Sequence, residues 1–244
     1  MPSSTVDALW AVASAPRRGR PFLAEWIHHC HRAGVESLSV VNLCCFFIGL
    51  VLALQTAVAL ARYGAEEQVT ALVCVSFVRE LGPVFAAVMF AGRVGTSISA
   101  ELASMRASDQ VDAWRAFGAD PVARLVAPRV WATIAMLPVL TVVGCGVGVT
   151  SGYLVGLSEG MASPRLFAAQ VADALSPLDL GVCVIKSIVF GGVIGAIAAE
   201  RGLGGPGGSA GVGRAATDTM VRSVIAILAL DVFLTKALLL WEAS

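Results

Sequence analysis

Residues 79–129 read RELGPVFAAVMFAGRVGTSISAELASMRASDQVDAWRAFGADPVARLVAPR. The stretch begins with an adjacent Arg79–Glu80 pair inside an apolar run, passes through small residues, and becomes a polar amphipathic segment before a proline-containing return. Charges within an apolar run are costly in lipid, so they indicate a functional site inside the membrane. The polar segment that follows them predicts a contact with a partner outside it.

The composition is that of an integral membrane protein. Of 244 residues, 57% are hydrophobic and 14% are charged, whereas soluble domains carry about 25% charged residues. The mean hydropathy is +0.80. The formal net charge is zero, so no basic excess indicates nucleic-acid binding. The six cysteines lie mostly in apolar runs without a CxxC motif, which predicts buried free thiols rather than disulfides.

Five apolar runs are long enough to cross about 30 Å of hydrocarbon. We predict membrane spans at residues 40–61, 69–97, 125–157, 180–199 and 220–241. The second run is longer than a span needs, and Gly82-Pro83 is expected to kink it. In the third run glycines recur every four residues and so share one helix face, which lets another helix approach closely. These glycines are Gly144, Gly148, Gly152 and Gly156.

Residues 1–38 precede the first span. The segment 22–32, with Trp26, is predicted to be a helix lying in the membrane interface, and a soluble tail is the alternative. The HHCH run at residues 28–31 could bind a transition metal, but a helix would spread these side chains around its circumference. We therefore predict no metal site. The predicted fold is an all-α polytopic membrane protein, with an N-terminal interfacial helix and five transmembrane helices.

Residues 101–118 are too polar to cross a membrane and are predicted to form a cytoplasmic amphipathic helix, ended by Gly118 and Asp120-Pro121. Its apolar residues share one side and its charged residues face water. The first set is Val111, Trp114, Ala116 and Phe117, and the second is Asp109, Asp112 and Arg115. This helix is the candidate surface for a partner.

Orientation follows from the basic residues near the ends of the spans. One side holds Arg17, Arg18, Arg20, Arg32, Arg106, Arg115, Arg124, Arg129, Arg201, Arg214 and Arg222, whereas the other holds mainly Arg62 and Arg165. We therefore expect the N-terminus, the helix at 101–118 and the glycine-rich loop at 202–213 in the cytoplasm, and the C-terminus outside.

Charges lie deep inside the predicted spans at Arg79, Glu80, Lys186 and Asp231. Each would cost about 2.5–3.5 kcal/mol at the bilayer centre, and the set about 10 kcal/mol. They are therefore expected to turn inward. Two interpretations remain open, an ion-pair lock between spans and a polar lining or gate for the headgroup of an amphiphile.

The sequence contains no specific motif for catalysis or nucleotide binding. The loop at 202–207 matches GxGxxG, but no strand precedes it, and no GxxxxGK[ST] motif occurs. The chain is thus predicted not to be an enzyme, and any ATPase must be a separate subunit. Two alternatives remain: a secondary transporter or channel, for which no inverted repeat is visible, and an intramembrane enzyme, for which Ser76 lacks a base.

Four segments resemble the MlaE/YrbE permease family, the membrane subunits of Mce-type ABC lipid transporters. They are RELGPVFAAVMFAGRVGTSISAEL, the following MRASDQVDAWRAFGADPVARLVAPR, IKSIVFGG, and SAGVGRAATDTMVRS with LALDVFLT. The similarity covers roughly residues 35–241, and the first two segments together are highly specific. It implies a permease domain at residues 39–241 after an N-terminal region at 1–38.

The resemblance implies a homodimeric permease, with a cytoplasmic N-terminus and a periplasmic C-terminus, in the inner membrane of a diderm bacterium. Its partners would be ABC ATPase subunits that carry the ATP and Mg²⁺, an MCE-domain substrate-binding protein outside, and often a STAS-domain protein. It would move phospholipids or related lipids, maintaining outer-membrane lipid asymmetry or lipid supply, with no cofactor in this chain. Arg79, Glu80, Lys186 and Asp231 would lie near the lipid cavity. The helix at 101–118 would couple to the ATPase through Asp109, Gln110, Asp112, Trp114 and Arg115.

Overall fold

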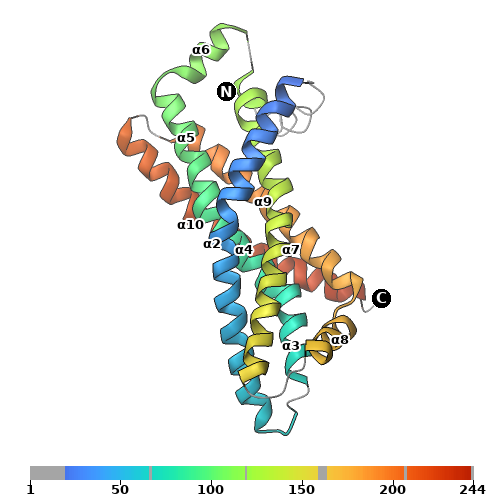
Figure 1. The fold of residues 1–244 in the computed structure, drawn as a ribbon. Helices are drawn as coiled ribbons and strands as arrows, with labels where there is room; N and C mark the ends of the chain where they lie inside the picture. The colour runs from blue at the N-terminus through green and yellow to red at the C-terminus, as the bar shows by residue number, and fades with distance from the viewer. Residues whose placement is uncertain (1–19, 66–67, 119, 159–163, 206–207, 243–244) are drawn as a thin grey trace. The chain divides into compact units, whose positions relative to one another are not determined.

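The chain forms a series of long helices in the computed structural model, which describes residues 20–65, 68–118, 120–158, 164–205 and 208–242 (Figure 1). No strand occurs among these residues. In chain order the helices, with π-helical segments labelled η, are α2 Arg20–Ala61, α3 Val69–Ser76, η3 Phe77–Leu81, α4 Gly82–Phe90, η4 Ala91–Gly95, α5 Thr96–Ala107, α6 Gln110–Ala116, η5 Val122–Val126, α7 Ala127–Ser158, α8 Pro164–Ala174, α9 Pro177–Gly204 and α10 Ser209–Glu242.

Within the described ranges, five helical segments are long and apolar enough to cross a membrane. They are Phe22–Ala61, Val69–Ala107, Val122–Leu157, Pro177–Gly204 and Ser209–Leu240. Each contains one of the predicted spans almost entirely and extends beyond it. The predicted all-α polytopic fold is therefore confirmed.

The predicted interfacial helix at 22–32 is helical, but it is not a separate element. Helix α2 runs through it and continues to Ala61 without a break. The reason is visible in the sequence, because no proline interrupts residues 22–61. The amphipathic character of this segment therefore does not mark a helix boundary.

The polar helix predicted at 101–118 is two helices, α5 and α6, separated at Ser108 and Asp109. The Ser108 hydroxyl donates a hydrogen bond to the carbonyl of Ser104 at 2.9 Å. Asp109 has φ 56°, in the left-handed region, which aspartate tolerates better than most residues. The second span thus continues as a helix to Ala107, and only the short α6 remains as a separate element.

The described residues pack into two compact units, each with its own core. Residues up to 37, 90–137 and 188–228 form unit 1, and residues 38–89, 138–187 and 229 onward form unit 2. Phe90, Leu102 and Ile194 are among the fully buried side chains of unit 1, and Phe77 and Leu140 are among those of unit 2. Several long helices therefore contribute one part of their length to each core.

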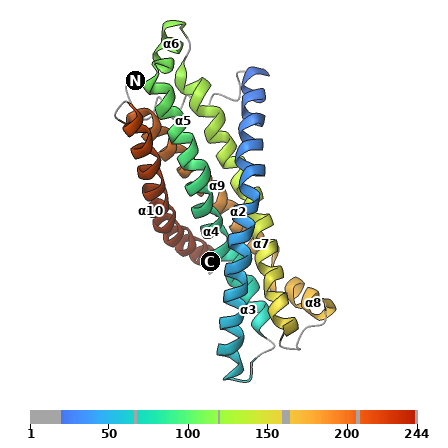
Figure 2. The same ribbon diagram turned by 60° about the vertical axis from the view of Figure 1, so that its left-hand side comes forward.

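In unit 1 the N-terminal part of α10 lies alongside α5 and the segment before it (Figure 2). A Cβ added at Gly92 would lie 3.2 Å from the sulfur of Met220, and one added at Gly95 would lie 3.0 Å from Ile194 of α9. Arg106, near the end of α5, donates to the carbonyl of Leu203 in the last turn of α9 and to that of Gly205 just after it. Small residues and this arginine together hold the three helices close.

In unit 2 the glycine face of α7 performs the predicted role. A Cβ added at Gly144 would lie 2.9 Å from the sulfur of Cys45 on α2, and one added at Gly148 would overlap the ring of Phe77. At Gly152 the nearest neighbours are at ordinary contact distance. The close approach predicted for this face is therefore confirmed, and it is tightest at Gly148.

We predict that Gly148→Ala lowers the free energy of unfolding by about 1–3 kcal/mol, because the added methyl group forces the buried Phe77 ring to move. The matched control is Gly146→Ala, where nothing lies within 4 Å of an added Cβ. At this exposed position alanine should be neutral or stabilise the helix by up to about 1 kcal/mol. Denaturant titrations of the purified proteins in detergent measure both changes. Equal stabilities of the two variants would contradict the packing described here.

Candidate functional site

The buried ammonium group of Lys186, on α9, is the centre of a polar cluster in unit 2. Its side chain is 0% exposed. The Nζ atom donates toward Glu80 Oε2 at 2.7 Å, Thr235 Oγ1 at 2.8 Å, Asp231 Oδ1 at 2.9 Å and the carbonyl oxygen of Arg79 at 3.1 Å. An ammonium group has three hydrogens. Four acceptors therefore share three donors, and the charge of Lys186 is balanced by two carboxylates.

The local backbone explains why the carbonyl of Arg79 can accept a hydrogen bond from Lys186. Pro83 stands four residues after Arg79 and has no N–H, so it cannot donate the usual helical hydrogen bond to that carbonyl. The helix adopts π-helical turns over Phe77–Leu81, and the N–H of Gly82 donates to the carbonyl of Phe77 five residues earlier. Lys186 supplies a hydrogen bond to the carbonyl of Arg79 from another helix.

Asp231 and Thr235 come from one face of α10, because residues four apart on a helix are neighbours. The Thr235 hydroxyl lies 3.1 Å from each carboxylate oxygen of Glu80. Thr235 thus contacts both Lys186 and Glu80, and Glu80 is more exposed than Asp231, the other carboxylate that pairs with Lys186. The Glu80 side chain is 39% exposed, so it is the member of this group that a ligand can reach.

The side chain of Arg79 pairs with a carboxylate that sequence reasoning missed. Its Nε donates to Asp179, whose side chain is 3% exposed. Asp179 is held by a capping box at the start of α9. The Ser176 N–H donates to Asp179 Oδ2 at 2.7 Å, and the Asp179 N–H donates to Ser176 Oγ at 3.3 Å. Pro177 occupies the first helical position, where its missing N–H costs nothing.

The four predicted residues are therefore brought into one cluster, but with two pairings rather than one. Glu80, Lys186 and Asp231 contact one another directly, whereas Arg79 bonds to Asp179 through its side chain and to Lys186 through its carbonyl. Counting two cations and three carboxylates, the cluster has a formal charge of −1. The signals that could have revealed the missed residues are the Ser-x-x-Asp pattern at Ser176 and the four-residue spacing from Asp231 to Thr235.

The predicted partner surface lies on and beside α6 in unit 1. Arg115 pairs with Asp112 at 2.7 Å, and the guanidinium of Arg124 lies 4.5 Å from the ring centroid of Trp114. Trp114 is thus partly engaged within the chain. Phe117, which the prediction of contact residues left out, is 84% exposed. The described surface also includes Asp109 and Gln110, both exposed.

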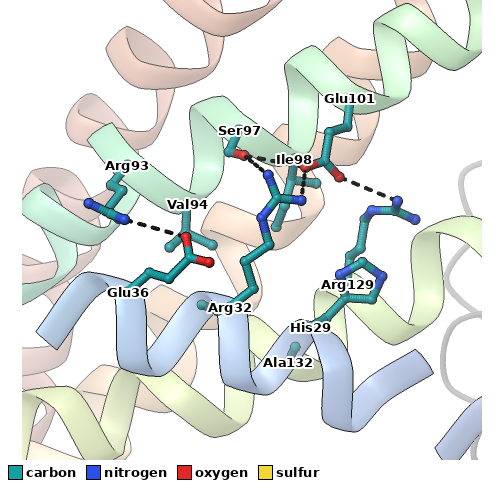
Figure 3. Close-up of a pocket in the computed structure, with 11 residues that line it drawn as sticks. His29, Arg32, Glu36, Arg93, Val94, Ser97, Ile98, Glu101, Arg129 and Ala132 are labelled. Atoms are coloured by element: carbon teal, nitrogen blue, oxygen red, sulfur yellow. Dashed lines mark hydrogen bonds and ion pairs between the residues drawn. The ribbon is translucent and has the colours of Figure 1, made fainter. Parts of the chain in front are cut away.

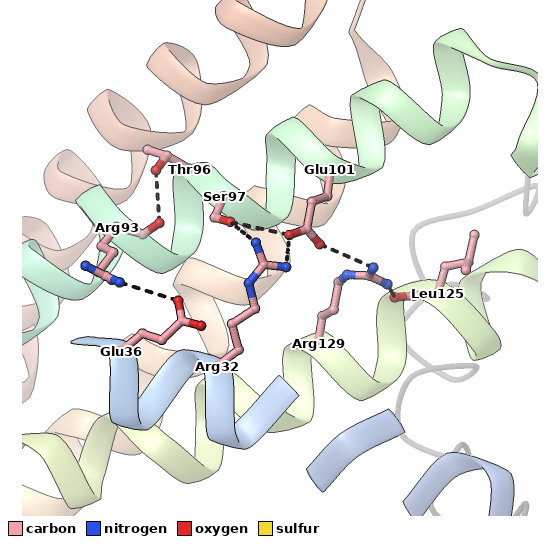
Figure 4. Close-up of polar contacts among 8 residues, drawn as sticks. All are labelled: Arg32, Glu36, Arg93, Thr96, Ser97, Glu101, Leu125 and Arg129. Carbon is pink, nitrogen blue, oxygen red and sulfur yellow. Dashed lines mark hydrogen bonds and ion pairs between the residues drawn. The ribbon is translucent and has the colours of Figure 1, made fainter. Parts of the chain in front are cut away.

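A second polar cluster, in unit 1, was not predicted. It lies around a cavity of about 150 Å³ (Figure 3). Its polar members are Arg32, Glu36, Arg93, Ser97, Glu101 and Arg129, drawn in Figure 4 with the contacts between them. Arg32 and Glu36 are four residues apart on α2, and Arg93, Ser97 and Glu101 follow the same spacing on the facing helix. This spacing of four residues is the signal in the sequence that could have indicated a polar face on each of the two helices.

No group of three or more His, Cys, Asp and Glu residues that could hold a metal ion occurs in the described part of the chain.

Comparison with known proteins identifies a family and several relatives. Residues 26–237 match the family model described as Permease MlaE. A probable ABC transporter permease protein of Rickettsia prowazekii is 41% identical over 203 residues, which is 83% of this chain and 78% of the relative. The intermembrane phospholipid transport system permease protein MlaE of Haemophilus influenzae is 35% identical over 210 residues, 86% of this chain and 80% of the relative.

A plant protein is also similar. Protein TRIGALACTOSYLDIACYLGLYCEROL 1, chloroplastic, of Arabidopsis thaliana is 33% identical over 219 residues, 90% of this chain and 63% of the relative. The family model thus covers most of the chain, and the five apolar helical segments agree with a multi-pass permease. The chain belongs to the MlaE permease family.

Proposed function

We propose that this chain is the membrane permease subunit of an ABC transporter that moves phospholipids or related lipids between the inner membrane and an MCE-domain partner. The observation that carries the proposal is the Lys186 cluster, a fully buried ammonium balanced by carboxylates within apolar helices. The name of the Haemophilus relative, an intermembrane phospholipid transport system permease, supports the substrate class. Maintenance of outer-membrane lipid asymmetry, or lipid supply, is the role we propose for the whole complex.

The cluster suits a group that is polar at one end and apolar at the other. A lipid headgroup is too polar for the bilayer core, so a path for it needs polar groups there, which are costly unless they are paired. Glu80 and Arg79 are the partly exposed members, whereas Lys186 and Asp179 are buried behind them. In the proposed mechanism the headgroup contacts the exposed pair, and the buried partners keep that pair oriented between transport events.

ATP is used by another subunit in this proposal. The sequence has no P-loop motif, and relatives of this chain are named as ABC transporter permeases. We assign ATP and Mg²⁺ to a partner ATPase that docks on α6. Movement of α6 would then pass along the second span, which runs back through the chain to Glu80 and Arg79.

The remaining parts of the proposal concern the assembly. The excess of arginines near one set of span ends supports a cytoplasmic position for α6 and the N-terminus, and a periplasmic position for the C-terminus. A homodimer, an external ring of MCE-domain subunits and a STAS-domain protein on the ATPase complete the proposed complex. Co-purification from the native membrane, followed by mass spectrometry of bound proteins and lipids, tests all of these assignments together.

We predict that Lys186→Met slows lipid transfer at least about tenfold in the reconstituted complex, since it leaves two carboxylates without their shared cation. Removing one member of a buried pair costs about 3–5 kcal/mol of folding stability. A tenfold slowing needs only about 1.4 kcal/mol of that disturbance to reach the barrier for transfer. Glu80→Gln keeps the side-chain volume and the Lys186–Asp231 pair, so it should retain folding while also slowing transfer.

The measurement is transfer of a fluorescent phospholipid from proteoliposomes, with thermal unfolding of each variant as a check on folding. Arg62→Gln, on an exposed turn residue, is the control and should transfer lipid at the normal rate. Normal transfer by folded Glu80→Gln would show that the cluster is a structural ion-pair lock and has no part in transport.

We predict that α6 and the residues after it form the ATPase docking surface. Trp114→Ala combined with Arg115→Glu should reduce co-purification of the ATPase, because the first change removes an aromatic contact and the second reverses a charge. Phe117→Glu should have a similar effect, because Phe117 presents a large apolar side chain to the surface.

The matched control is Tyr63→Glu. Tyr63 is 84% exposed, as Phe117 is, but it lies after the first span, which we place at the opposite membrane face. The ATPase retained on affinity-purified permease is quantified for each variant. Retention that is equal for Phe117→Glu, the Trp114 and Arg115 double variant, and Tyr63→Glu would refute docking on α6.

A further inference from the structure

The cavity in unit 1 has a strongly polar lining that the Lys186 cluster does not account for. Its volume is about 150 Å³, more than a single water molecule needs. The lining comes from α2, from η4 and α5, and from α7 (Figure 3). Its ionisable members are His29, Arg32, Glu36, Arg93, Glu101 and Arg129.

The charges around this cavity are unbalanced toward the positive. Three guanidinium groups face two carboxylates, a formal charge of +1 with His29 neutral. Arg32 and Arg129 both donate to Glu101, and Arg93 donates to Glu36. Each guanidinium carries five N–H donors, so donors far outnumber the carboxylate oxygens that can accept from them. The cavity therefore offers more donors than its own acids can satisfy.

Two of these ion pairs are also long. The Arg93–Glu36 and Arg129–Glu101 pairs both measure 3.4 Å, whereas close pairs of this type measure about 2.7–2.9 Å. Arg32 makes the closer contact with Glu101 and, through its other terminal nitrogen, lies 3.4 Å from Ser97 (Figure 4). Arg129 and Arg93 are thus the guanidinium groups that an additional acceptor would satisfy best.

Arg129 provides a separate indication of a missing acceptor. The residue is 6% exposed, and its Nε–H is buried with no hydrogen-bond partner among the described residues. A terminal nitrogen of the same guanidinium donates to the carbonyl of Leu125. Leaving a buried charged donor unsatisfied is costly, about 1–3 kcal/mol or more. Such a cost is expected where a ligand supplies the acceptor.

We propose that this cavity binds a phosphate group. A phosphate has several acceptor oxygens and a negative charge, which match an excess of guanidinium donors and a formal charge of +1. The phosphate belongs either to the headgroup of a lipid or to inorganic phosphate, and the recognition chemistry is the same for both. The site lies in unit 1, so it is separate from the Lys186 cluster and does not depend on the transport proposed above.

The alternative is that these residues only lock helices together through ion pairs. The two readings differ in the effect expected at Glu36. Removing the carboxylate of Glu36 takes away a negative charge that repels phosphate and frees Arg93, so an anion site should bind more tightly. A structural lock would merely lose one contact. Glu36 and Arg93 have half-exposed side chains, so the chain should fold when either is substituted.

The experiment uses the full chain, purified in a non-ionic detergent. Inorganic phosphate or the short-chain lipid dihexanoyl phosphatidic acid is titrated at constant ionic strength, and Kd is taken from the thermal shift. Hydrogen–deuterium exchange of peptides covering residues 29–36 and 93–101 locates the bound probe. We expect Arg93→Gln to weaken binding by at least about threefold and Glu36→Gln to strengthen it by a similar factor, from Coulomb interactions across a partly hydrated site.

Two controls make the same charge changes on exposed residues of unit 1 that do not line the cavity. Arg222→Gln and Asp218→Asn should leave the Kd unchanged. Binding of both probes, with opposite effects at Arg93 and Glu36, supports a phosphate site of either source. Binding of the lipid alone identifies a headgroup site, and binding of inorganic phosphate alone identifies a soluble anion. If neither probe protects these peptides, or if Glu36→Gln fails to strengthen binding, the cluster is an ion-pair lock and the proposal is wrong.

Discussion

A cation with no access to solvent, held among apolar helices, is the constraint on which unit 2 depends. The ammonium of Lys186 tolerates this position because Glu80, Asp231, Thr235 and a main-chain carbonyl surround it. Unpaired, such a charge would cost several kcal/mol. The requirement to satisfy it fixes which faces of η3, α9 and α10 meet. The same requirement places one acid, Glu80, at the accessible edge of the cluster.

The two polar clusters described above balance their charges differently. In unit 2 the carboxylates outnumber the bases and every predicted member has a close partner. In unit 1 the bases outnumber the carboxylates, and a buried guanidinium retains an unsatisfied donor. A cluster with an excess of acceptors and a cluster with an excess of donors favour ligand groups of opposite kind. An amphiphile with a zwitterionic headgroup carries both kinds of group.

Much of this could be predicted from the sequence, because the cost of polar groups in lipid is visible in composition alone. The five spans and the charges at Arg79, Glu80, Lys186 and Asp231 follow from that cost. Arg93 and Glu101 could not be assigned to a cluster from the sequence, because Gly, Ser and Thr surround them and the segment resembles the polar end of a span. Asp179 lies at the end of a span, where a charge costs little free energy. Its hydrogen bonds with Ser176 account for it as a helix cap, so the sequence alone provides no reason to expect a pairing with Arg79.

Other features depend on contacts between distant segments and could not be predicted. Ser108 and Asp109 favour caps and turns, but such residues also occur within exposed helices, so the sequence of residues 101–118 does not by itself require the break that the structure shows. Likewise, the pairing of Arg79 with Asp179 rather than with a nearer acid depends on how α9 begins. Periodicity identifies the faces of helices, but the partners across those faces are decided by packing.

The proline at position 83 has a mechanical consequence. It deprives the carbonyl of Arg79 of its main-chain donor four residues on, and the hydrogen bond that Lys186 donates takes that place. The hydrogen bonding of this span around Arg79 is thereby coupled to the position of Lys186. If the lysine withdraws, the carbonyl oxygen of Arg79 loses a donor inside a membrane-spanning segment, so a rearrangement of this turn and release of the lysine are expected to occur together.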